Sequence, residues 1–392
     1  MPDVAGSGPI DGEPETGQGA LRAVLSCPTG NLSIPPHCYS SEAVLDAERE
    51  AIFRRCWIGI GRSDRFANKG DYEALDIADN PVIVLRDDKG RLQSFANTCR
   101  HRGARLLDGQ GTVNAIRCPF HTWTYRLDGR LAGAPKMDGV DGFRKEDNGL
   151  TPYTTAEAHG FAFIHLGPNP EPIEDCLGDF SAMHSPWPLA DLVTARRRIF
   201  DVNCNWKAFL DVFNEYYHLA AVHPNSIANL YADPDPLDRT TGAFATQFGV
   251  TEGTGGLLQD EQQHALPKLP GLTGRNAAGS RYTWLFPTVT FSASLDALWV
   301  YEAYPLTPGA CRVAQSVCLH PTAFDTPGYD EKVQRYFSRM DAAIDEDIPA
   351  LENQQRGLAS PEARSGYLSP SHEPAVAAFA RWYAATMLKG QA

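Results

Sequence analysis

The stretch CRHRGARLLDGQGTVNAIRCPFH, residues 99–121, contains two short groups of metal-binding residues. One residue separates Cys99 from His101, two residues separate Cys118 from His121, and 16 residues lie between the two groups. Two cysteines and two histidines can hold a zinc ion, or a [2Fe–2S] cluster that has thiolates on one iron and imidazoles on the other. Structural zinc sites usually use C-x-x-C knuckles or paired histidines on a helix, so this spacing favours the iron–sulfur cluster.

The residues around these four side chains are compatible with two tight loops. Gly103 allows a sharp turn in the first loop, and Pro119 stiffens the second loop between its two ligands. We expect the two cysteines to bind the inner iron and the two histidines the outer iron. Neutral imidazoles in place of anionic thiolates make that iron easier to reduce, which raises the reduction potential of the cluster.

Composition excludes several other classes of protein. The chain has 392 residues, enough for about two domains, and 43% of them are hydrophobic. A net charge of −13 argues against a nucleic-acid-binding face and against docking on an anionic membrane. No stretch approaches the roughly 18 apolar residues of a membrane span, and the N-terminus lacks the features of a secretory signal. We therefore expect a cytoplasmic enzyme that acts on a small molecule.

Nine scattered cysteines do not form the dense disulfide framework of a small secreted domain. Apart from Cys99 and Cys118, we expect them to be small core residues in a reducing compartment.

The secondary-structure signals predict an α+β protein with two structural domains. Residues 1–19 are rich in Gly, Pro and acids, so residues 1–35 are expected to form a disordered tail and lead-in. Residues 36–166 begin with a helix over 40–57 and continue as short strands separated by turns such as DDKG and LDGR, which predicts a small β domain. Residues 167–392 combine helical patterns, including those over 205–223 and 329–357, with strand-like segments.

A second metal site is suggested by His218 and His223 in NEYYHLAAVHP. Five residues along an undistorted helix place two side chains about 140° apart, so both can reach one metal only if the helix is distorted or ends between them. Pro224 disfavours helical geometry at His223 and makes such a break reasonable. Iron(II) that activates O₂ is typically held by two histidines and one carboxylate, so a third ligand is expected.

The third ligand is expected in the acid-rich helix SRMDAAIDEDIPALENQQRGL. Asp347 lies three residues after Ile344 and four before Leu351, so it shares the buried face of that helix. We expect the neighbouring acids to turn away from this face or to be solvated: Asp341, Asp345, Glu346 and Glu352.

Two segments, FANTCRHRGARLL and CPFHTWTYRLDGRL, resemble the cluster-binding loops of the α subunits of Rieske non-haem iron oxygenases, the aromatic-ring-hydroxylating and betaine-type demethylating family. The resemblance extends over nearly the whole chain after the tail. It implies a Rieske [2Fe–2S] domain followed by a helix-grip (START-like) catalytic domain with an antiparallel sheet and helices. It also implies that His218, His223 and the Asp347 of an "ED" motif hold a mononuclear Fe(II).

The resemblance assigns a further role to Glu215, which lies three residues before His218 and on the same face of the predicted helix. In the family, an acid at this position joins the mononuclear site to the Rieske cluster of the neighbouring subunit. Asp is common there, whereas this chain has Glu. The family often has Glu-Asn-Phe just upstream, whereas this chain has Asp211-Val212-Phe213, so the asparagine of that motif has no match here.

The activity that the resemblance implies is that of a terminal oxygenase component. An NAD(P)H-dependent flavin/iron–sulfur reductase, with or without a ferredoxin, would supply electrons through the cluster to the Fe(II), where O₂ and substrate meet. Family members place cluster and iron from adjacent subunits side by side in head-to-tail trimers, so we expect a homotrimer with Glu215 at the junction.

Aromatic residues on two predicted strands are candidates for the substrate pocket. The candidates, which could equally be core residues, are Tyr282, Trp284, Phe286, Trp299 and Tyr301. An aromatic cage suits a quaternary ammonium group, whereas an apolar slot suits an aromatic ring. Glu215, the segment NQQRGLASPEA and the modest length resemble the branch that acts on choline- and betaine-like compounds. Monooxygenation or N-demethylation of such a compound is therefore preferred over dioxygenation in aromatic compound catabolism.

Two alternatives of other classes remain at this point: a Rieske-type electron carrier without oxygenase activity, and a zinc-stapled binding module. The roughly 220 residues beyond Leu166, with their His/His/Asp set, count against the carrier. The run ARRRIF at 195–200 is expected to be a solvated edge, with reductase docking as the alternative. The remaining histidines are expected to be packing or surface residues: His37, His159, His165, His184, His264, His320 and His372.

Overall fold

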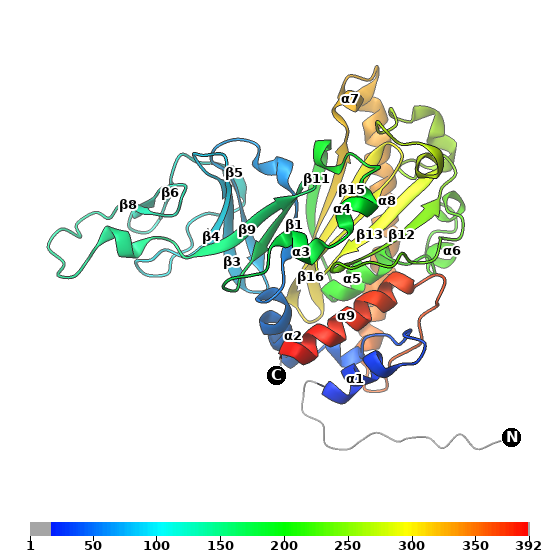
Figure 1. Ribbon diagram of the computed structural model, residues 1–392, viewed down its shortest axis with the longest axis horizontal. Helices are drawn as coiled ribbons and strands as arrows, with labels where there is room; N and C mark the ends of the chain where they lie inside the picture. Colours follow the sequence, from blue (N-terminus) through cyan, green and yellow to red (C-terminus); the bar gives the residue numbers. More distant parts are fainter. Residues whose placement is uncertain (1–16, 391–392) are drawn as a thin grey trace.

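The structure is a computed structural model that describes residues 17–390. Figure 1 shows a β region built from the first half of the chain beside a larger region in which helices cover a sheet. The predicted α+β class, a small β domain followed by an antiparallel sheet with helices, is confirmed. Within the described residues, no helix is both long enough and apolar enough to cross a membrane.

The β region contains a seven-stranded antiparallel sheet with the order β1-β10-β9-β4-β3-β2-β5, and a small sheet with the order β6-β7-β8. Two of its turns were predicted from the sequence: Asp87–Gly90 connects β3 to β4, and Leu127–Arg130 connects β7 to β8. The strands are β1 (Ile58–Arg62), β2 (Asp71–Ile77), β3 (Asn80–Arg86), β4 (Leu92–Ala96), β5 (Gln110–Thr112), β6 (Ile116–Arg117), β7 (Thr124–Tyr125), β8 (Leu131–Gly133), β9 (Pro152–Ala158) and β10 (Phe161–His165).

The larger region is built on a six-stranded antiparallel sheet with the order β11-β16-β15-β14-β13-β12. Its strands are β11 (Val193–Val202), β12 (Phe244–Val250), β13 (Gly279–Leu285), β14 (Val289–Ala293), β15 (Ala297–Thr307) and β16 (Ala310–Leu319). Its helices are α3 (Ile173–Leu177), α4 (Phe180–His184), α5 (Trp206–Phe213), α6 (Leu219–Val222), α7 (Pro321–Phe324), α8 (Tyr329–Leu358) and α9 (Pro374–Gly390).

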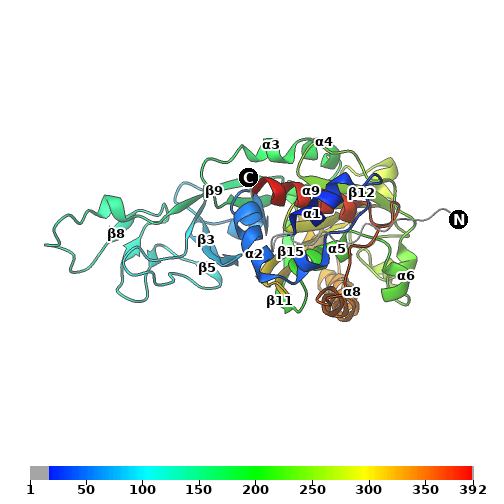
Figure 2. The same ribbon diagram turned by 90° about the horizontal axis from the view of Figure 1, so that it is seen from below.

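Helices cover both faces of this sheet. In Figure 2, α8 lies on one side of it, and α3 and α4 lie on the other. Side chains alternate between the two faces along a strand, so β15 presents Trp299 and Tyr301 to the side of α5 and α8, and Leu298, Val300 and Glu302 to the opposite side. The first set lies near the candidate metal ligands, and the second set faces the β region.

The N-terminal part differs from the prediction. Residues 1–16 of the expected disordered tail lie outside the described residues, but residues 18–26 of the expected lead-in form helix α1 (Gln18–Ser26). Leu21 and Val24 are buried, because α1 packs against the C-terminal helix α9. Such contacts between the two ends of the chain cannot be predicted from the local composition of the first residues.

The helix predicted over 40–57 is shorter and ends in a wider turn. It consists of α2 (Glu42–Glu48), capped by the Ser41 hydroxyl, followed by the π-helical turn Arg49–Phe53. Both pieces pack on α9, next to α1 (Figure 1). The helix at the start of the predicted domain 36–166 therefore packs into the hydrophobic core of the larger region.

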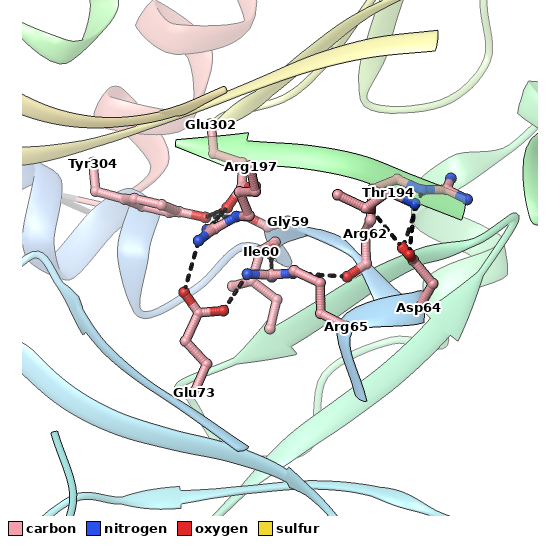
Figure 3. Close-up of polar contacts among 10 residues, drawn as sticks. All are labelled: Gly59, Ile60, Arg62, Asp64, Arg65, Glu73, Thr194, Arg197, Glu302 and Tyr304. Atoms are coloured by element: carbon pink, nitrogen blue, oxygen red, sulfur yellow. Dashed lines mark hydrogen bonds and ion pairs between the residues drawn. The ribbon is translucent and has the colours of Figure 1, made fainter. Parts of the chain in front are cut away.

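A buried network of charged side chains connects the β region to the six-stranded sheet (Figure 3). The Arg197 guanidinium donates to Glu73 Oε1 over 3.0 Å and to Glu302 Oε2 over 3.2 Å. Arg65 also pairs with Glu73, and the Tyr304 hydroxyl lies 3.1 Å from Glu302 Oε2. Burial lowers the pKa of Arg197, but the two glutamates raise it by more, so the net shift is upward.

The prediction of a solvated edge for residues 195–200 holds only in part: β11 is an edge strand of the six-stranded sheet and Ile199 is exposed, but the arginines are paired within the chain. The Arg197 side chain is only 9% exposed, and Arg196 and Arg198 both donate to Asp341 of α8. Asp341, which was also expected to be solvated, is their partner. All three arginines of the run have acidic partners within the chain, because alternate residues of β11 face different neighbours.

We expect Arg197→Met to lower the free energy of unfolding by about 3–5 kcal/mol, because it leaves Glu302 buried without a cation and leaves Glu73 with Arg65 alone. Arg312→Met is the matched control, since Arg312 pairs with Asp201 at the surface, where the two side chains are 47% and 51% exposed. That change should cost less than about 1 kcal/mol. Urea unfolding of the two variants measures the difference, and equal losses would show that the network does not stabilise the junction.

Candidate metal centres and pocket

The first cysteine–histidine group lies in the loop between β4 and β5, and the second lies between β6 and β7. Cys99 and Cys118 are 3% and 1% exposed. Each is held by backbone hydrogen bonds: Cys99 N–H donates to the Ala104 carbonyl over 2.8 Å, and Cys118 N–H donates to the Trp123 carbonyl over 2.8 Å. Gly103, which was expected to permit the first turn, has a φ of +72°.

The two loops lie side by side: Cys99 and Cys118 belong to one buried cluster with Trp123 and Tyr125, and both thiols act on the pKa of Tyr125. The rings of His101 and His121 lie with their centroids 4.7 Å apart, and His101 stacks on Trp123 at 4.9 Å. Nδ1 of His101 is buried without a hydrogen-bond partner among the described residues. A buried nitrogen without a partner, beside two buried thiols and a second imidazole, fits the ligand set of a Rieske cluster.

Tyr125 supports the buried side of this site. Its hydroxyl lies 3.3 Å from Cys99 Sγ and accepts a hydrogen bond from the Arg100 N–H over 3.0 Å. Burial raises the pKa of Tyr125, and the nearby Cys99 thiol raises it further. The hydroxyl therefore keeps its proton and can donate a hydrogen bond to a thiolate. Hydrogen bonds to cluster sulfur raise the reduction potential.

The helix predicted over 205–223 is interrupted. Helix α5 ends at Phe213, residues 214–218 form a non-helical turn, and α6 starts at Leu219. Asn214 is buried at the break, where its side chain donates to the Leu210 carbonyl over 2.7 Å and accepts from Thr290 over 2.9 Å. His218 and His223 are the N-cap and C-cap of α6, and the backbone of His223 is no longer helical. The helix therefore ends between the two histidines, as their spacing requires.

His218, His223 and Asp347 come together in the structure, with one donor atom from each lying within 4.8 Å of the others. Asp347 Oδ1 is 3.0 Å from Nε2 of His223 and 3.7 Å from Nε2 of His218. This buried oxygen makes no hydrogen bond of normal geometry. Two imidazole nitrogens and one carboxylate oxygen that converge without hydrogen-bonding one another fit a mononuclear Fe(II) site.

A carboxylate holds the other ring nitrogen of each histidine. Glu215 Oε1 lies 2.5 Å from Nδ1 of His218, and Glu346 Oε2 lies 2.6 Å from Nδ1 of His223. The pairing leaves both Nε2 atoms free to bind a metal, as carboxylate–histidine pairs do around metal sites. The expectation that Glu215 and His218 share one helix face is wrong, because Glu215 lies in the break and reaches His218 across the turn.

Glu346 was missed, and the prediction that it turns away is wrong. Its side chain reaches sideways from α8 to His223 and also accepts a hydrogen bond from the Ser226 hydroxyl over 2.5 Å. A helical wheel gives the direction of the Cα–Cβ bond, whereas a long side chain extends well beyond it. The available signal was the position of Glu346 directly before Asp347 in the ED pair.

The electrostatics at His223 favour a positive charge. Burial lowers the pKa of His223, but Asp347 and Glu346 together raise it by more, so the net pKa is above its usual value. A position that favours a proton in this way also favours a bound cation.

A small cavity of about 60 Å³ lies against the three candidate iron ligands. Of the predicted pocket residues, Tyr282, Trp299 and Tyr301 line it. The cavity has other lining residues that were not predicted, and four of them are aromatic or charged: Phe213, Tyr216, Tyr231 and Arg339. Burial strongly raises the pKa of both Tyr216 and Tyr282, so their hydroxyls remain neutral.

Trp284 and Phe286 do not line this cavity. Trp284 stacks on Phe379 of α9 with ring centroids 3.9 Å apart, and Phe286 lies 5.3 Å from the same ring. Both are core residues, as the alternative interpretation held. They share a sheet face with Tyr282 but lie further along it, where α9 covers the sheet.

Comparison with protein families gives two matches. Residues 189–389 match the ring hydroxylating alpha subunit (catalytic domain) family, and residues 56–144 match the Rieske [2Fe–2S] domain family.

Several characterised proteins are similar over most of the chain. The glycine betaine monooxygenase oxygenase subunit of Chromohalobacter salexigens is 29% identical, with 98% of this chain and 93% of that protein covered. The carnitine monooxygenase oxygenase subunit of Acinetobacter baumannii is 28% identical, with 84% and 85% covered.

Solved structures share the fold. A quaternary ammonium Rieske monooxygenase in complex with an inhibitor superposes with a TM-score of 0.79 at 24% identity, covering 97% of this chain and all of that chain. Naphthalene 1,2-dioxygenase from Rhodococcus sp. superposes with a TM-score of 0.74 at 22% identity, covering 95% and 98%.

Proposed function

Because the chain belongs to the family of ring-hydroxylating α subunits and carries a Rieske [2Fe–2S] domain, we propose that it is the oxygenase component that monooxygenates or N-demethylates a small quaternary ammonium compound. An oxygenase of this family takes O₂ and electrons from a reductase, so the catalytic domain argues against a simple electron carrier. The bound cluster and mononuclear iron supply electron storage and O₂ activation.

The aromatic wall of the cavity is the observation that carries the choice of substrate. The centroid of the Phe213 ring lies 4.6 Å from that of Tyr301 and 6.0 Å from that of Tyr282. All three residues line the cavity beside the His/His/Asp group. Faces and edges of such rings attract a quaternary ammonium group without offering it a hydrogen bond, which it could not use. Similarity to the glycine betaine and carnitine enzymes points in the same direction.

Naphthalene 1,2-dioxygenase shares the fold at 22% identity, which by itself does not favour aromatic-ring hydroxylation. The relatives at 28–29% identity are glycine betaine and carnitine monooxygenase subunits, so a quaternary ammonium substrate is preferred.

The residues that we propose as ligands have distinct roles. Cys99, His101, Cys118 and His121 would hold the cluster, and His218, His223 and Asp347 would hold the iron. Glu215 and Glu346 orient the two histidines by accepting hydrogen bonds from their Nδ1–H groups. The rings around the cavity hold the substrate and exclude water from the space next to the metal ligands.

The distance between the two centres in one chain supports a head-to-tail homotrimer. In Figure 1 the loops around β6 and β8 lie at one end of the molecule, and α6 lies at the opposite end. Glu215 and His218 border both the small cavity and a second cavity of about 350 Å³. We propose that the cluster loops of a neighbouring subunit approach this second cavity, with Glu215 between the two centres.

Substrate screening tests the proposal. Purified enzyme with a surrogate flavin/iron–sulfur reductase and NAD(P)H should consume O₂ on addition of glycine betaine, carnitine or choline, and formaldehyde release would identify N-demethylation. The uncharged isostere of glycine betaine, 3,3-dimethylbutanoate, is the control, because it has the same shape without the cation. Faster coupled turnover of the isostere or of small aromatic compounds would contradict the proposal.

A further inference from the structure

Arg339 is a buried cation without an acidic partner. The residue is 4% exposed and lines the small cavity beside the candidate iron ligands. No carboxylate oxygen of residues 17–390 lies within 4.0 Å of its guanidinium. By contrast, Arg196, Arg197 and Arg198 of β11 all pair with carboxylates.

The contacts of Arg339 leave part of its hydrogen-bonding capacity unused. Nη2 donates to the Tyr231 hydroxyl over 2.5 Å, Nη1 lies 3.3 Å from the Met340 sulfur, and Nε has no partner. The guanidinium carbon lies 5.2 Å from the centre of the Trp299 ring. A buried charge is unfavourable unless an opposite charge balances it, so these contacts point to an anion that arrives with a ligand.

The charges of opposite sign around the cavity are separated. Asp347, Glu215 and Glu346 surround the two histidines, whereas Arg339 lines the cavity from about two turns earlier on α8. Arg339 and Asp347 are eight residues apart on α8, so their Cα atoms are separated by about 12 Å along the helix axis. A ligand with a cation near the metal ligands and an anion at its far end complements this arrangement.

We propose that Arg339 determines substrate specificity by binding a carboxylate at the end of the substrate distant from the reacting N-methyl groups. The inference rests on the proposed function, and it narrows the substrate class to zwitterionic betaines as opposed to amino alcohols such as choline. The planar guanidinium can donate two parallel hydrogen bonds to a carboxylate, whereas an alcohol offers neither the charge nor the second acceptor.

Binding and steady-state kinetics of four ligands test the two proposals separately. Glycine betaine and carnitine carry both charges, choline carries only the ammonium group, and 3,3-dimethylbutanoate carries only the carboxylate. We expect the better of the two zwitterions to have a Kd by calorimetry, and a KM, on the order of 10- to 100-fold below those of choline. Glycine betaine and 3,3-dimethylbutanoate differ only in the charged ammonium group. Comparing their affinities therefore tests the proposed function independently of Arg339.

Arg339→Met should abolish most of the preference for the carboxylate by raising KM for the zwitterion and leaving KM for choline nearly unchanged. Arg339→Lys should restore part of it, because the charge returns without the paired donors. Arg335→Met is the matched control: Arg335 lies one turn earlier on α8, pairs with Glu261 and Glu331, and should not affect the preference. Retained cluster absorbance together with an unchanged urea unfolding midpoint shows that each variant is folded.

Two outcomes would overturn the role of Arg339. One is a folded Arg339→Met enzyme that loses affinity for choline and zwitterion equally, as a purely structural residue would. The other is a wild-type enzyme that binds choline as tightly as both zwitterions, a comparison that needs no variant to fold. If 3,3-dimethylbutanoate binds as tightly as glycine betaine, and if this binding depends on Arg339, the carboxylate contact is supported. The same result would refute the proposal that the cavity recognises a quaternary ammonium group.

Discussion

Replacing His223 by Ala is expected to abolish turnover of any substrate while leaving the absorption spectrum of the Rieske cluster unchanged. The change removes one of three converging donor atoms, of which Nε2 of His223 is 3.0 Å from Asp347 Oδ1. Mutating a residue that only hydrogen-bonds a metal ligand already lowers metal affinity or activity about 10- to 100-fold. Loss of a ligand itself should therefore lower activity by more. Coupled O₂ consumption and the visible spectrum measure the two effects.

His264→Ala is the matched control, because His264 lies in the turn Gln259–His264 and lines neither the small cavity nor the second cavity, so the change should leave activity and spectrum unchanged. Turnover that survives in His223→Ala, with the iron content unchanged, would remove this histidine from the metal site. A bleached cluster would show that the change disturbs the whole fold.

Glu215→Gln is expected to lower turnover by more than about 100-fold, and added Fe(II) should not restore it. Glu215 holds Nδ1 of His218 and borders the second cavity, where we place the neighbouring subunit. The amide would keep the shape of the side chain but lose the charge that holds the imidazole proton. Oxidation of a pre-reduced cluster on mixing with O₂ and substrate, followed by stopped-flow absorbance, measures the step directly.

Glu346→Gln separates this effect from metal binding, because Glu346 makes the same contact with His223 and does not border the second cavity. We expect its metal affinity to fall about 10- to 100-fold, with turnover restored by excess Fe(II). Identical behaviour of the two variants would mean that Glu215 only orients His218, and it would leave the electron path between subunits without its proposed bridge.

The parts of the site that could be predicted depend on short-range spacing. Cys-x-His and Cys-x-x-His fix where two loops must carry their ligands, and the structure places the four side chains together. Asp347 could be selected because the apolar stripe of its helix defines one buried face, and α8 was predicted almost to its ends. Both inferences use the geometry of a single element.

The parts that could not be predicted depend on contacts between elements. The break after Phe213 is stabilised by Asn214 and Thr290, which are distant in sequence. The division of aromatic residues into pocket and core depends on where α9 crosses the sheet, so Trp284 was grouped wrongly with Tyr282. The lining residues Phe213, Tyr216, Tyr231 and Arg339 come from three separate segments that only the tertiary fold brings together.

The central claim is that two kinds of iron site cooperate in one enzyme, and iron and acid-labile sulfide analysis of anaerobically purified protein tests it most directly. We expect about three irons and two sulfides per chain for the wild type, from one [2Fe–2S] cluster and one mononuclear iron. His223→Ala should retain about two of each. Wild-type protein without acid-labile sulfide, or with zinc in place of iron, would contradict the account.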